Sequence, residues 1–194
     1  TDSVDLGEGR DTVLLTGTNP ASNVYVVVSL GDSTGDYLVL GSGADTIALS
    51  SGADTVLADV GNDYLDLGAG ANSVNAGAGD DTVIALGGDD TVIALGGDDT
   101  VFAGEGSDSI SVGDGANIVD LGSGADTVIG GTGADSVYAA YAGDSTGSHA
   151  DRYQLGAGSD TVYAGVGSDY IDVTATNAST GDSDYVDAGS GSDT

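Results

Sequence analysis

The chain of 194 residues has no cysteine, methionine, tryptophan or lysine, and it has one phenylalanine and one proline. The absence of cysteine excludes disulfide bonds and thiolate metal sites. Only two residues, Arg10 and Arg152, are basic, which excludes nucleic acid and an anionic membrane surface as partners because both are bound through Lys and Arg. No apolar stretch is long enough to span a bilayer, so no membrane insertion is expected. Aromatic side chains are too few to fill an ordinary globular core.

Glycine and acidic residues dominate what is present. The chain has 35 glycines and 32 aspartates and glutamates, and its net charge is −30. Repulsion among so many like charges holds a free chain open unless cations neutralise it. The composition therefore predicts a protein whose folding is coupled to the binding of cations.

The most informative stretch is a threefold repeat of nine residues. Residues 77–103 read GAGDDTVIA, LGGDDTVIA and LGGDDTVFA, with nothing between the copies. The Gly and Asp at the front of each unit are typical of a tight turn. The aliphatic alternation at its end is too short for a helix and fits a strand of three or four residues. A turn and a short strand repeated every nine residues predict a coil wound on itself.

The same unit recurs along most of the chain. One copy lies at 7–15, eleven follow one another over 41–139, and two more lie at 156–173. Three interruptions separate them, at 16–40, 140–155 and 174–188, and they are expected to project as loops; the first contains an apolar strand at 23–30. Both termini fall inside a unit, so residues 1–194 are interpreted as one continuous repeat domain and a fragment of a longer chain.

Each position of the unit has its own preference. Position three is always Gly, which indicates a positive φ or a close approach of two backbones. Position five is Asp, except at Asn72 and Asn117. Position seven is always Val, Ile or Leu, and position nine is mostly Ala or Leu. Positions seven and nine therefore share the inner face of a strand, and position eight faces out.

Residues 121–129, Leu-Gly-Ser-Gly-Ala-Asp-Thr-Val-Ile, match all but the first glycine of the pattern Gly-Gly-x-Gly-x-Asp-x-aliphatic-x. The array thus resembles the calcium-binding nonapeptide repeats of the RTX family. The second glycine of the pattern is replaced at Ser50, Asp59, Leu86 and Leu95, which questions the turn geometry more than metal binding. The resemblance implies an all-β fold, a right-handed parallel β-roll with inserted loops, in which eighteen residues make one coil of two strands and two turns.

The resemblance also implies Ca²⁺ ions between successive turns, held by Asp carboxylates and backbone carbonyls. The residues expected to bind them are Asp11, Asp36, Asp45, Asp54, Asp63, Asp81, Asp90, Asp99, Asp108, Asp126, Asp135, Asp160 and Asp169. Those at 45, 63, 81 and 99 are expected on one edge of the roll, and those at 36, 54, 90, 108 and 126 on the other. Asn72 and Asn117 are expected to mark weaker or empty sites.

Elementary chemistry supports this assignment. Turns in a parallel stack lie ~4.8 Å apart, where like-charged carboxylates repel unless a hard divalent cation bridges them. Zinc would prefer His or Cys, which are nearly absent. The alternative is a solvated acidic face without a specific metal, but acidity of that kind would not keep Asp at one position of the unit.

Two further patterns are open to other interpretations. The sequence GDSTG at 31–35 and 143–147 resembles the surroundings of a protease serine, but the single histidine, His149, cannot serve two copies. A polar turn is the better interpretation, and no enzyme is expected. Ile84 and Phe102 are eighteen residues apart at position eight, with Asp120 beyond them. They form either a lateral contact surface or ordinary exposed strand residues.

The predicted rod of roughly ten coils is about 50 Å long. We expect a calcium-binding structural segment of a secreted bacterial protein, such as a surface layer, filament or adhesin, located outside the cell. It would associate with itself or continue into the same array. Two alternatives remain: a calcium-triggered secretion and folding module of an enzyme or toxin, and an ice-binding roll. The second is weaker because position two shows no regular threonine array.

Overall fold

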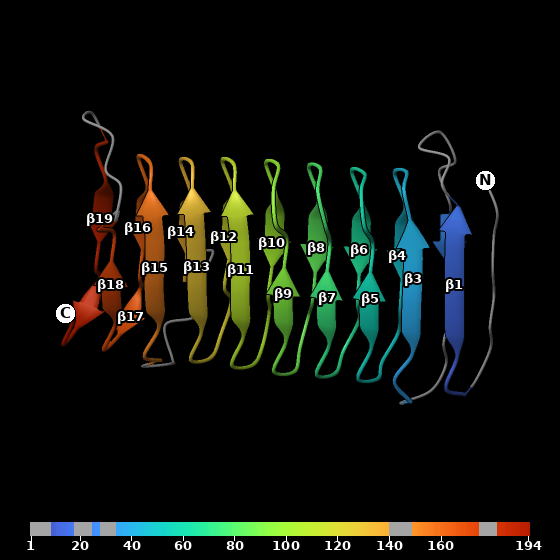
Figure 1. The fold of residues 1–194 in the computed structure, drawn as a ribbon. Helices are drawn as coiled ribbons and strands as arrows, with labels where there is room; N and C mark the ends of the chain where they lie inside the picture. Colours follow the sequence, from blue (N-terminus) through green and yellow to red (C-terminus); the bar gives the residue numbers. More distant parts are fainter. Residues whose placement is uncertain (1–8, 18–24, 28–33, 140–148, 175–181) are drawn as a thin grey trace.

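The computed structural model describes residues 9–17, 25–27, 34–139, 149–174 and 182–194. These residues form strands joined by tight turns, and no helix occurs among them. Two nine-stranded parallel sheets face each other, and the chain passes from one sheet to the other at every turn (Figure 1). This is the predicted parallel β-roll. In the part of the chain that the structure describes, no helix is long and apolar enough to cross a membrane.

The strands divide between two large sheets and one small one. The first sheet contains, in spatial order, β1 (Thr12–Gly17), β3 (Tyr37–Gly41), β5 (Thr55–Leu57), β7 (Ser73–Asn75), β9 (Thr91–Ile93), β11 (Ser109–Asp114), β13 (Thr127–Thr132), β15 (Arg152–Ala157) and β18 (Tyr170–Asp172). The second contains β2 (Tyr25–Val27), β4 (Thr46–Ala48), β6 (Tyr64–Asp66), β8 (Thr82–Ile84), β10 (Thr100–Phe102), β12 (Ile118–Asp120), β14 (Ser136–Tyr138), β16 (Thr161–Tyr163) and β19 (Tyr185–Asp187). A third sheet pairs β17 (Val166–Gly167) with β20 (Ser190–Gly191).

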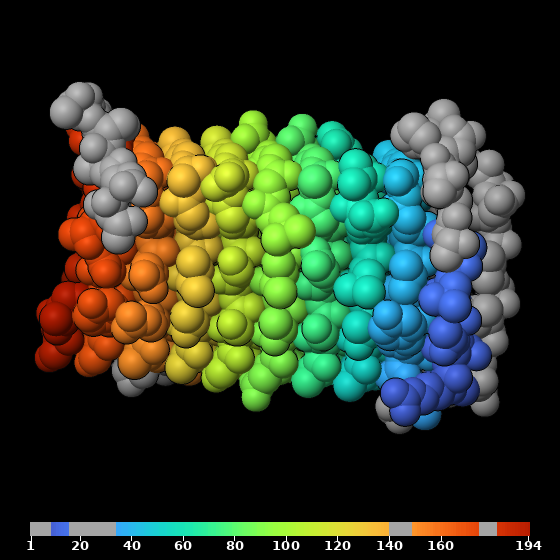
Figure 2. Space-filling view, viewed as in Figure 1, coloured from blue at the N-terminus to red at the C-terminus, as the bar shows by residue number. Residues whose placement is uncertain are grey.

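The register follows directly from the repeat. Val83 pairs with Val101, and Val101 pairs with Val119, so equivalent positions of successive coils lie side by side. Each coil therefore repeats the side-chain pattern of the coil before it. In the space-filling view the coils lie as bands in sequence order along a rod (Figure 2).

The core is a thin layer between the two large sheets. Position seven (Val83, Val92) and position nine (Ala85, Ala94) are almost completely buried. At position eight, Phe102 is 42% exposed. The strand alternation therefore agrees with the expectation that positions seven and nine face in and position eight faces out. Because many of the inner side chains are small, the sheets close on each other with little apolar volume between them.

Coil structure extends into all three expected interruptions. Residues 37–41 already form β3, which pairs with β1. Residues 152–157 form β15, and residues 185–187 form β19, each in register with the preceding coil. Of the apolar strand expected at 23–30, β2 covers residues 25–27, and the remainder lies outside the described residues. The projecting loops themselves also fall largely outside them.

The turn positions explain the demand for glycine. Gly79, at position three, has φ +132°, and a methyl group on it would lie 2.0 Å from the carbonyl oxygen of Gly61 in the coil before. Position three therefore needs both a positive φ and a close backbone approach, as the sequence indicated. Such an approach leaves no room for any side chain.

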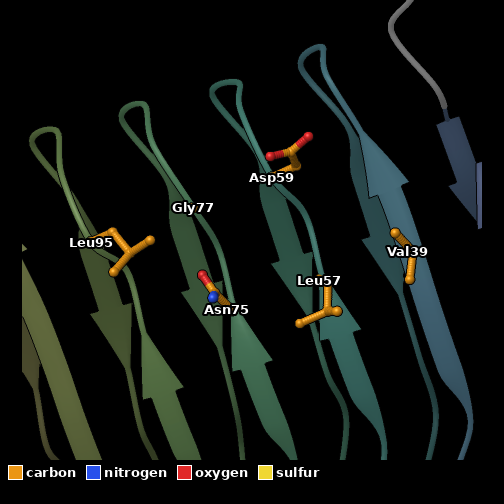
Figure 3. Close-up of a pocket in the computed structure, with 6 residues that line it drawn as sticks. All are labelled: Val39, Leu57, Asp59, Asn75, Gly77 and Leu95. Carbon is orange, nitrogen blue, oxygen red and sulfur yellow. The ribbon is translucent and has the colours of Figure 1, made fainter. Parts of the chain in front are cut away.

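Position one adopts a positive φ at three of the four places named above where glycine is replaced, Ser50 being the exception. Asp59, Leu86 and Leu95 have φ values of 82°, 68° and 79°, which are strained for residues with a Cβ. Along the stack each of them has glycine one coil before and after it, as Gly77 lies between Asp59 and Leu95. The missing side chain of Gly77 leaves a shallow hollow on the outer side of the first sheet, lined by Val39, Leu57, Asp59, Asn75, Gly77 and Leu95 (Figure 3).

Candidate metal centre

The aspartates at position five point into the roll. Asp81 and Asp90 are 2% and 1% exposed, because position five shares the inner face with positions seven and nine. Among the thirteen predicted residues, Asp11 is half-buried and all the others are buried: Asp36, Asp45, Asp54, Asp63, Asp81, Asp90, Asp99, Asp108, Asp126, Asp135, Asp160 and Asp169. A solvated acidic face would leave these side chains in water, whereas the structure buries them.

Two ladders of hydrogen bonds connect these residues, one at each edge of the roll. In both, the backbone N–H of one residue donates to Oδ1 of its equivalent in the next coil; Asp63 donates to Asp81 at 2.8 Å and Asp90 donates to Asp108 at 2.8 Å. One ladder runs through residues 45, 63, 81, 99, 117, 135, 160 and 184. The other runs through residues 11, 36, 54, 72, 90, 108, 126, 151, 169 and 193. The predicted division between the two edges is therefore observed.

The second oxygen of the ladder carboxylates, Oδ2, is unusual in having no hydrogen-bond partner in many of these residues. Oδ2 is buried and has no hydrogen-bond partner in Asp63, Asp81, Asp90, Asp99, Asp108, Asp126, Asp135, Asp160 and Asp169. A buried polar group without a partner costs about 1–3 kcal/mol, and more when it is charged. A repeated cost of this size indicates that another group belongs beside these oxygens.

Burial also makes the carboxylates hard to ionise. It raises the pKa of Asp63, Asp99 and Asp126 to about 7 each, and that of Asp81, Asp90 and Asp135 to about 6 each. Neighbouring carboxylates add to the rise, and the ladder N–H bonds oppose it. A divalent cation supplies the positive charge that would keep these groups ionised at neutral pH.

Backbone carbonyls face the same spaces. The hydrogen bonds between turns use the carbonyls of positions one, two and five, as in Ala69 to Ser50 and Thr82 to Asp63, and leave that of position three aside. A methyl group built on Gly61 would lie 1.8 Å from the carbonyl oxygen of Gly43 and 3.1 Å from Oδ1 of Asp63. A carbonyl and a carboxylate thus converge on a space that only glycine leaves open.

The donor set fits a calcium ion. Calcium binds about six to eight oxygen atoms from carboxylates and carbonyls in flexible geometry. No group of three or more His, Cys, Asp or Glu side chains converges on one point within the described ranges. A metal at the turns would therefore need backbone carbonyls beside the aspartates, as the resemblance implied.

Three ladder aspartates are missing from the set predicted from the sequence: Asp151, Asp184 and Asp193. Each accepts the ladder N–H of the preceding coil, from Asp126, Asp160 and Asp169 respectively. The first two lie inside expected interruptions, and the third in an incomplete unit at the end of the chain. Aligning Asp151-Arg-Tyr-Gln-Leu with positions five to nine would have found the first.

The GDSTG motif contributes no residue to the ladders in the part of the chain that the structure describes. Residues 31–33 and 143–147, which hold most of the two GDSTG copies, lie outside the described residues. His149 forms a backbone bridge to Gly167. It therefore serves as part of a coil in the structure.

The comparison with protein families agrees with this geometry. The model of the RTX calcium-binding nonapeptide repeat matches residues 30–65, 58–92, 66–101, 93–128, 102–137 and 145–177, which together cover more than half of the chain. No individual curated protein matches the chain. RTX repeats bind Ca²⁺ and occur in secreted proteins. The chain belongs to the family of RTX calcium-binding nonapeptide repeat proteins.

Proposed function

We propose that this chain is a calcium-stiffened structural segment of a secreted bacterial protein that forms a surface layer, a filament or an adhesin. The observation that carries the proposal is the pair of ladders of buried carboxylates, in nine of which, from Asp63 to Asp169, the second oxygen lacks a protein donor. The roll has a thin core and a net charge of −30. Its stability must therefore come largely from what neutralises those carboxylates.

The calcium ligands that we propose are the position-five aspartates of both ladders and the position-three carbonyls. The aspartates are the thirteen expected from the sequence together with Asp184 and Asp193; Asp151 is left out because its Oδ2 already accepts a hydrogen bond from the Tyr153 hydroxyl. Their Oδ1 atoms hold consecutive coils together through N–H bonds, which leaves Oδ2 for the ion. A bound cation would join two coils, so each ion would stiffen the rod along its length.

The calcium dependence suits a protein that works outside the cell. Extracellular calcium-binding modules bind with dissociation constants of ~0.1–1 mM, whereas the cytosol holds far less calcium. The chain would then stay open before export and close into the roll afterwards. Folding outside the cell would give an extended rigid element where a surface assembly needs one.

Lateral self-association is supported by the outer side of the second sheet. Tyr138 and Tyr163 stack with ring centroids 5.4 Å apart, and Tyr185 continues the row at 5.6 Å from Tyr163. Phe102 lies at the equivalent position two coils nearer the centre and is 42% exposed, with Asp120 between it and Tyr138. This row would supply apolar contact area along the rod.

The test combines circular dichroism with small-angle X-ray scattering on the whole chain. In excess chelator we expect a disordered spectrum and an expanded particle. In millimolar calcium we expect a β-rich spectrum and the scattering of a rod, with larger particles at high protein concentration. A β-rich rod that is unchanged by chelator would contradict the calcium-stiffened segment. A monomer at every concentration would remove the assembly role alone.

A further inference from the structure

Two side chains in the ladders differ from their counterparts in other coils. Asn117 stands at position five in place of Asp, and Tyr153 stands at position seven, where every complete unit has Val, Ile or Leu. Each of them carries hydrogen-bond donors into the buried row of oxygens, which aspartate and aliphatic side chains cannot do.

Asn117 bridges a backbone carbonyl and a ladder carboxylate. Its Oδ1 accepts the N–H of Asp99 at 2.9 Å, so its amide nitrogen turns the other way. That nitrogen donates to the carbonyl of Gly115 at 3.2 Å and to Oδ1 of Asp135 at 2.9 Å. Gly115 is at position three. The amide therefore joins a position-three carbonyl to Oδ1 of a ladder carboxylate, and it leaves Oδ2 of Asp135 without a hydrogen-bond partner.

Tyr153 donates a hydrogen bond to a carboxylate oxygen of the other ladder. Its ring is completely buried in the core, and its hydroxyl donates to Oδ2 of Asp151 at 3.3 Å. Among the buried ladder aspartates from Asp63 to Asp169, Asp151 is the one whose second oxygen receives a hydrogen bond from the protein. Valine at the same position has no hydrogen-bond donor, so it could not satisfy this oxygen.

Asn72 makes no comparable bridge. Its Oδ1 accepts the N–H of Asp54 at 3.0 Å, and its side chain lowers the pKa of the Asp90 carboxyl, but its side-chain nitrogen makes no hydrogen bond of normal geometry and reaches no carbonyl. Replacement of Asp by Asn is therefore not sufficient. The difference lies in whether the amide contacts both a carbonyl and a carboxylate.

We propose that Asn117 and Tyr153 each take the place of a bound cation, so that the turn between Asn117 and Asp135 and the site beside Asp151 stay free of calcium when the rest of the ladders is loaded. The inference rests on the proposed calcium ladders. A cation at either place would meet the positive end of an N–H or O–H dipole and would have to displace a formed hydrogen bond.

The two positions lie close together along the roll. Asn117 precedes β12 and Asp151 precedes β15, so the coil formed by β13 and β14 lies between them. The strands β11, β13 and β15 around this coil have six residues each, where most of the others have three. This part of the rod is thus held by protein donors and by longer strand pairing, and it needs fewer ions than the coils at 77–103.

The first experiment counts bound calcium in the whole chain by native mass spectrometry at saturating calcium. Asn117→Asp and Tyr153→Phe remove the internal donors and keep the side-chain size, so each should bind one calcium ion more than the wild-type chain, and the double variant two more. The control is Asn62→Asp, which adds the same charge as Asn117→Asp at an exposed position on the same edge. It should leave the count unchanged.

The outcomes separate the two levels of the proposal. A wild-type chain that binds no calcium would overturn the calcium ladders themselves. A wild-type chain that binds calcium, with unchanged counts in Asn117→Asp and Tyr153→Phe, would overturn only the role of the two donors.

Crystals of the calcium-loaded wild-type chain provide a test that depends on no variant. Anomalous difference peaks are expected between Asp63 and Asp81 and between Asp81 and Asp99. No peak is expected between Asn117 and Asp135 or beside the Tyr153 hydroxyl. A calcium peak at either of the last two places would overturn the inference, whatever the variants do.

Discussion

Two rows of aspartate run one residue apart through residues 77–103, and their surroundings differ completely. Asp81, Asp90 and Asp99 are buried, whereas Asp80, Asp89 and Asp98 are exposed. The inner row receives its N–H bond from the preceding coil, as from Asp63 to Asp81, and the outer row from the following coil, as from Ser107 to Asp89. One step along a strand reverses the direction of the side chain. The comparison shows that place in the unit, and not acidity, makes a carboxylate a candidate ligand.

Removal of calcium is the largest perturbation of this comparison. Without cations the carboxylates of both rows repel one another. Only those of the inner row are buried in the core, so the roll as a whole should unfold. We expect the β signal in circular dichroism to disappear in excess chelator and to return at ~0.1–1 mM calcium. Magnesium at equal concentration is the control, since it prefers a smaller octahedral site with bound water. Recovery with magnesium alone would argue against sites built for calcium.

The second prediction concerns pH in the absence of metal. Burial raises the pKa of Asp63, Asp99 and Asp126 from 3.8 to about 7 in the roll, and unfolding returns it to its ordinary value. The metal-free roll then binds more protons than the open chain, so this contribution to stability is fully present below pH ~4 and is lost as the pH rises through about 7.

In chelator, β structure should therefore be greater at pH 5 than at pH 8. Both values lie above the isoelectric point of about 4.1, so precipitation near zero net charge is avoided. With calcium present the trend should reverse, because protons compete with the ion for the carboxylates. Equal spectra at the two pH values in chelator would show that the inner row is not buried in the metal-free chain.

The third prediction concerns the close contact that buries the inner row. Gly79→Ala places a methyl group 2.0 Å from the Gly61 carbonyl at a φ of +132°. The strain alone should cost about 1–3 kcal/mol, and the displaced carbonyl should add to it. The matched control is Gly87→Ala, where the nearest atom lies at 3.7 Å. Calcium titrations followed by circular dichroism should show a large rise of the folding midpoint for the first variant and little change for the second.

The smallest expected effect is the difference between substitutions of two neighbouring aspartates, Asp90 and Asp89. Asp90→Ala removes a ladder acceptor and a proposed ligand, which should cost about 1–3 kcal/mol and raise the calcium midpoint. Asp89→Ala removes an exposed acceptor of the Ser107 N–H, and its midpoint should change by about twofold at most. The sites between Asp81 and Asp99 lie on the other edge and should be spared. Equal shifts for the two variants would erase the distinction between the inner and outer rows.

The period of the sequence was enough to predict the roll, the two edges and the inward positions. Nine residues per turn and strand place Asp81 and Asp99 in the same column whatever the details of packing. The stacking of Ile84 on Phe102 follows from the same arithmetic and is observed. Periodicity is a strong guide here because every coil contacts only its neighbours.

The nine-residue period could not predict the places where the structure departs from it. Asp151 follows Asp126 by 25 residues, so a strict count of eighteen misses it. The amide of Asn117 bridges two oxygens, and that of Asn72 does not. This difference comes from the orientation of the two side chains, which cannot be read from the sequence pattern. The positive φ of Leu86 and Leu95 likewise follows from the stacking of neighbouring turns.

The direction of the hydrogen bonds between coils has a mechanical consequence. Both large sheets pair strand to strand along the rod axis, so a pull along that axis loads the coils in series, and the weakest would detach first. A detached coil releases the eighteen residues of one ladder step, which lengthens the chain by about 60 Å when extended. Stretching a single molecule should then give evenly spaced ruptures whose force rises with calcium, and the rod would act as a shock absorber that re-forms when the tension falls.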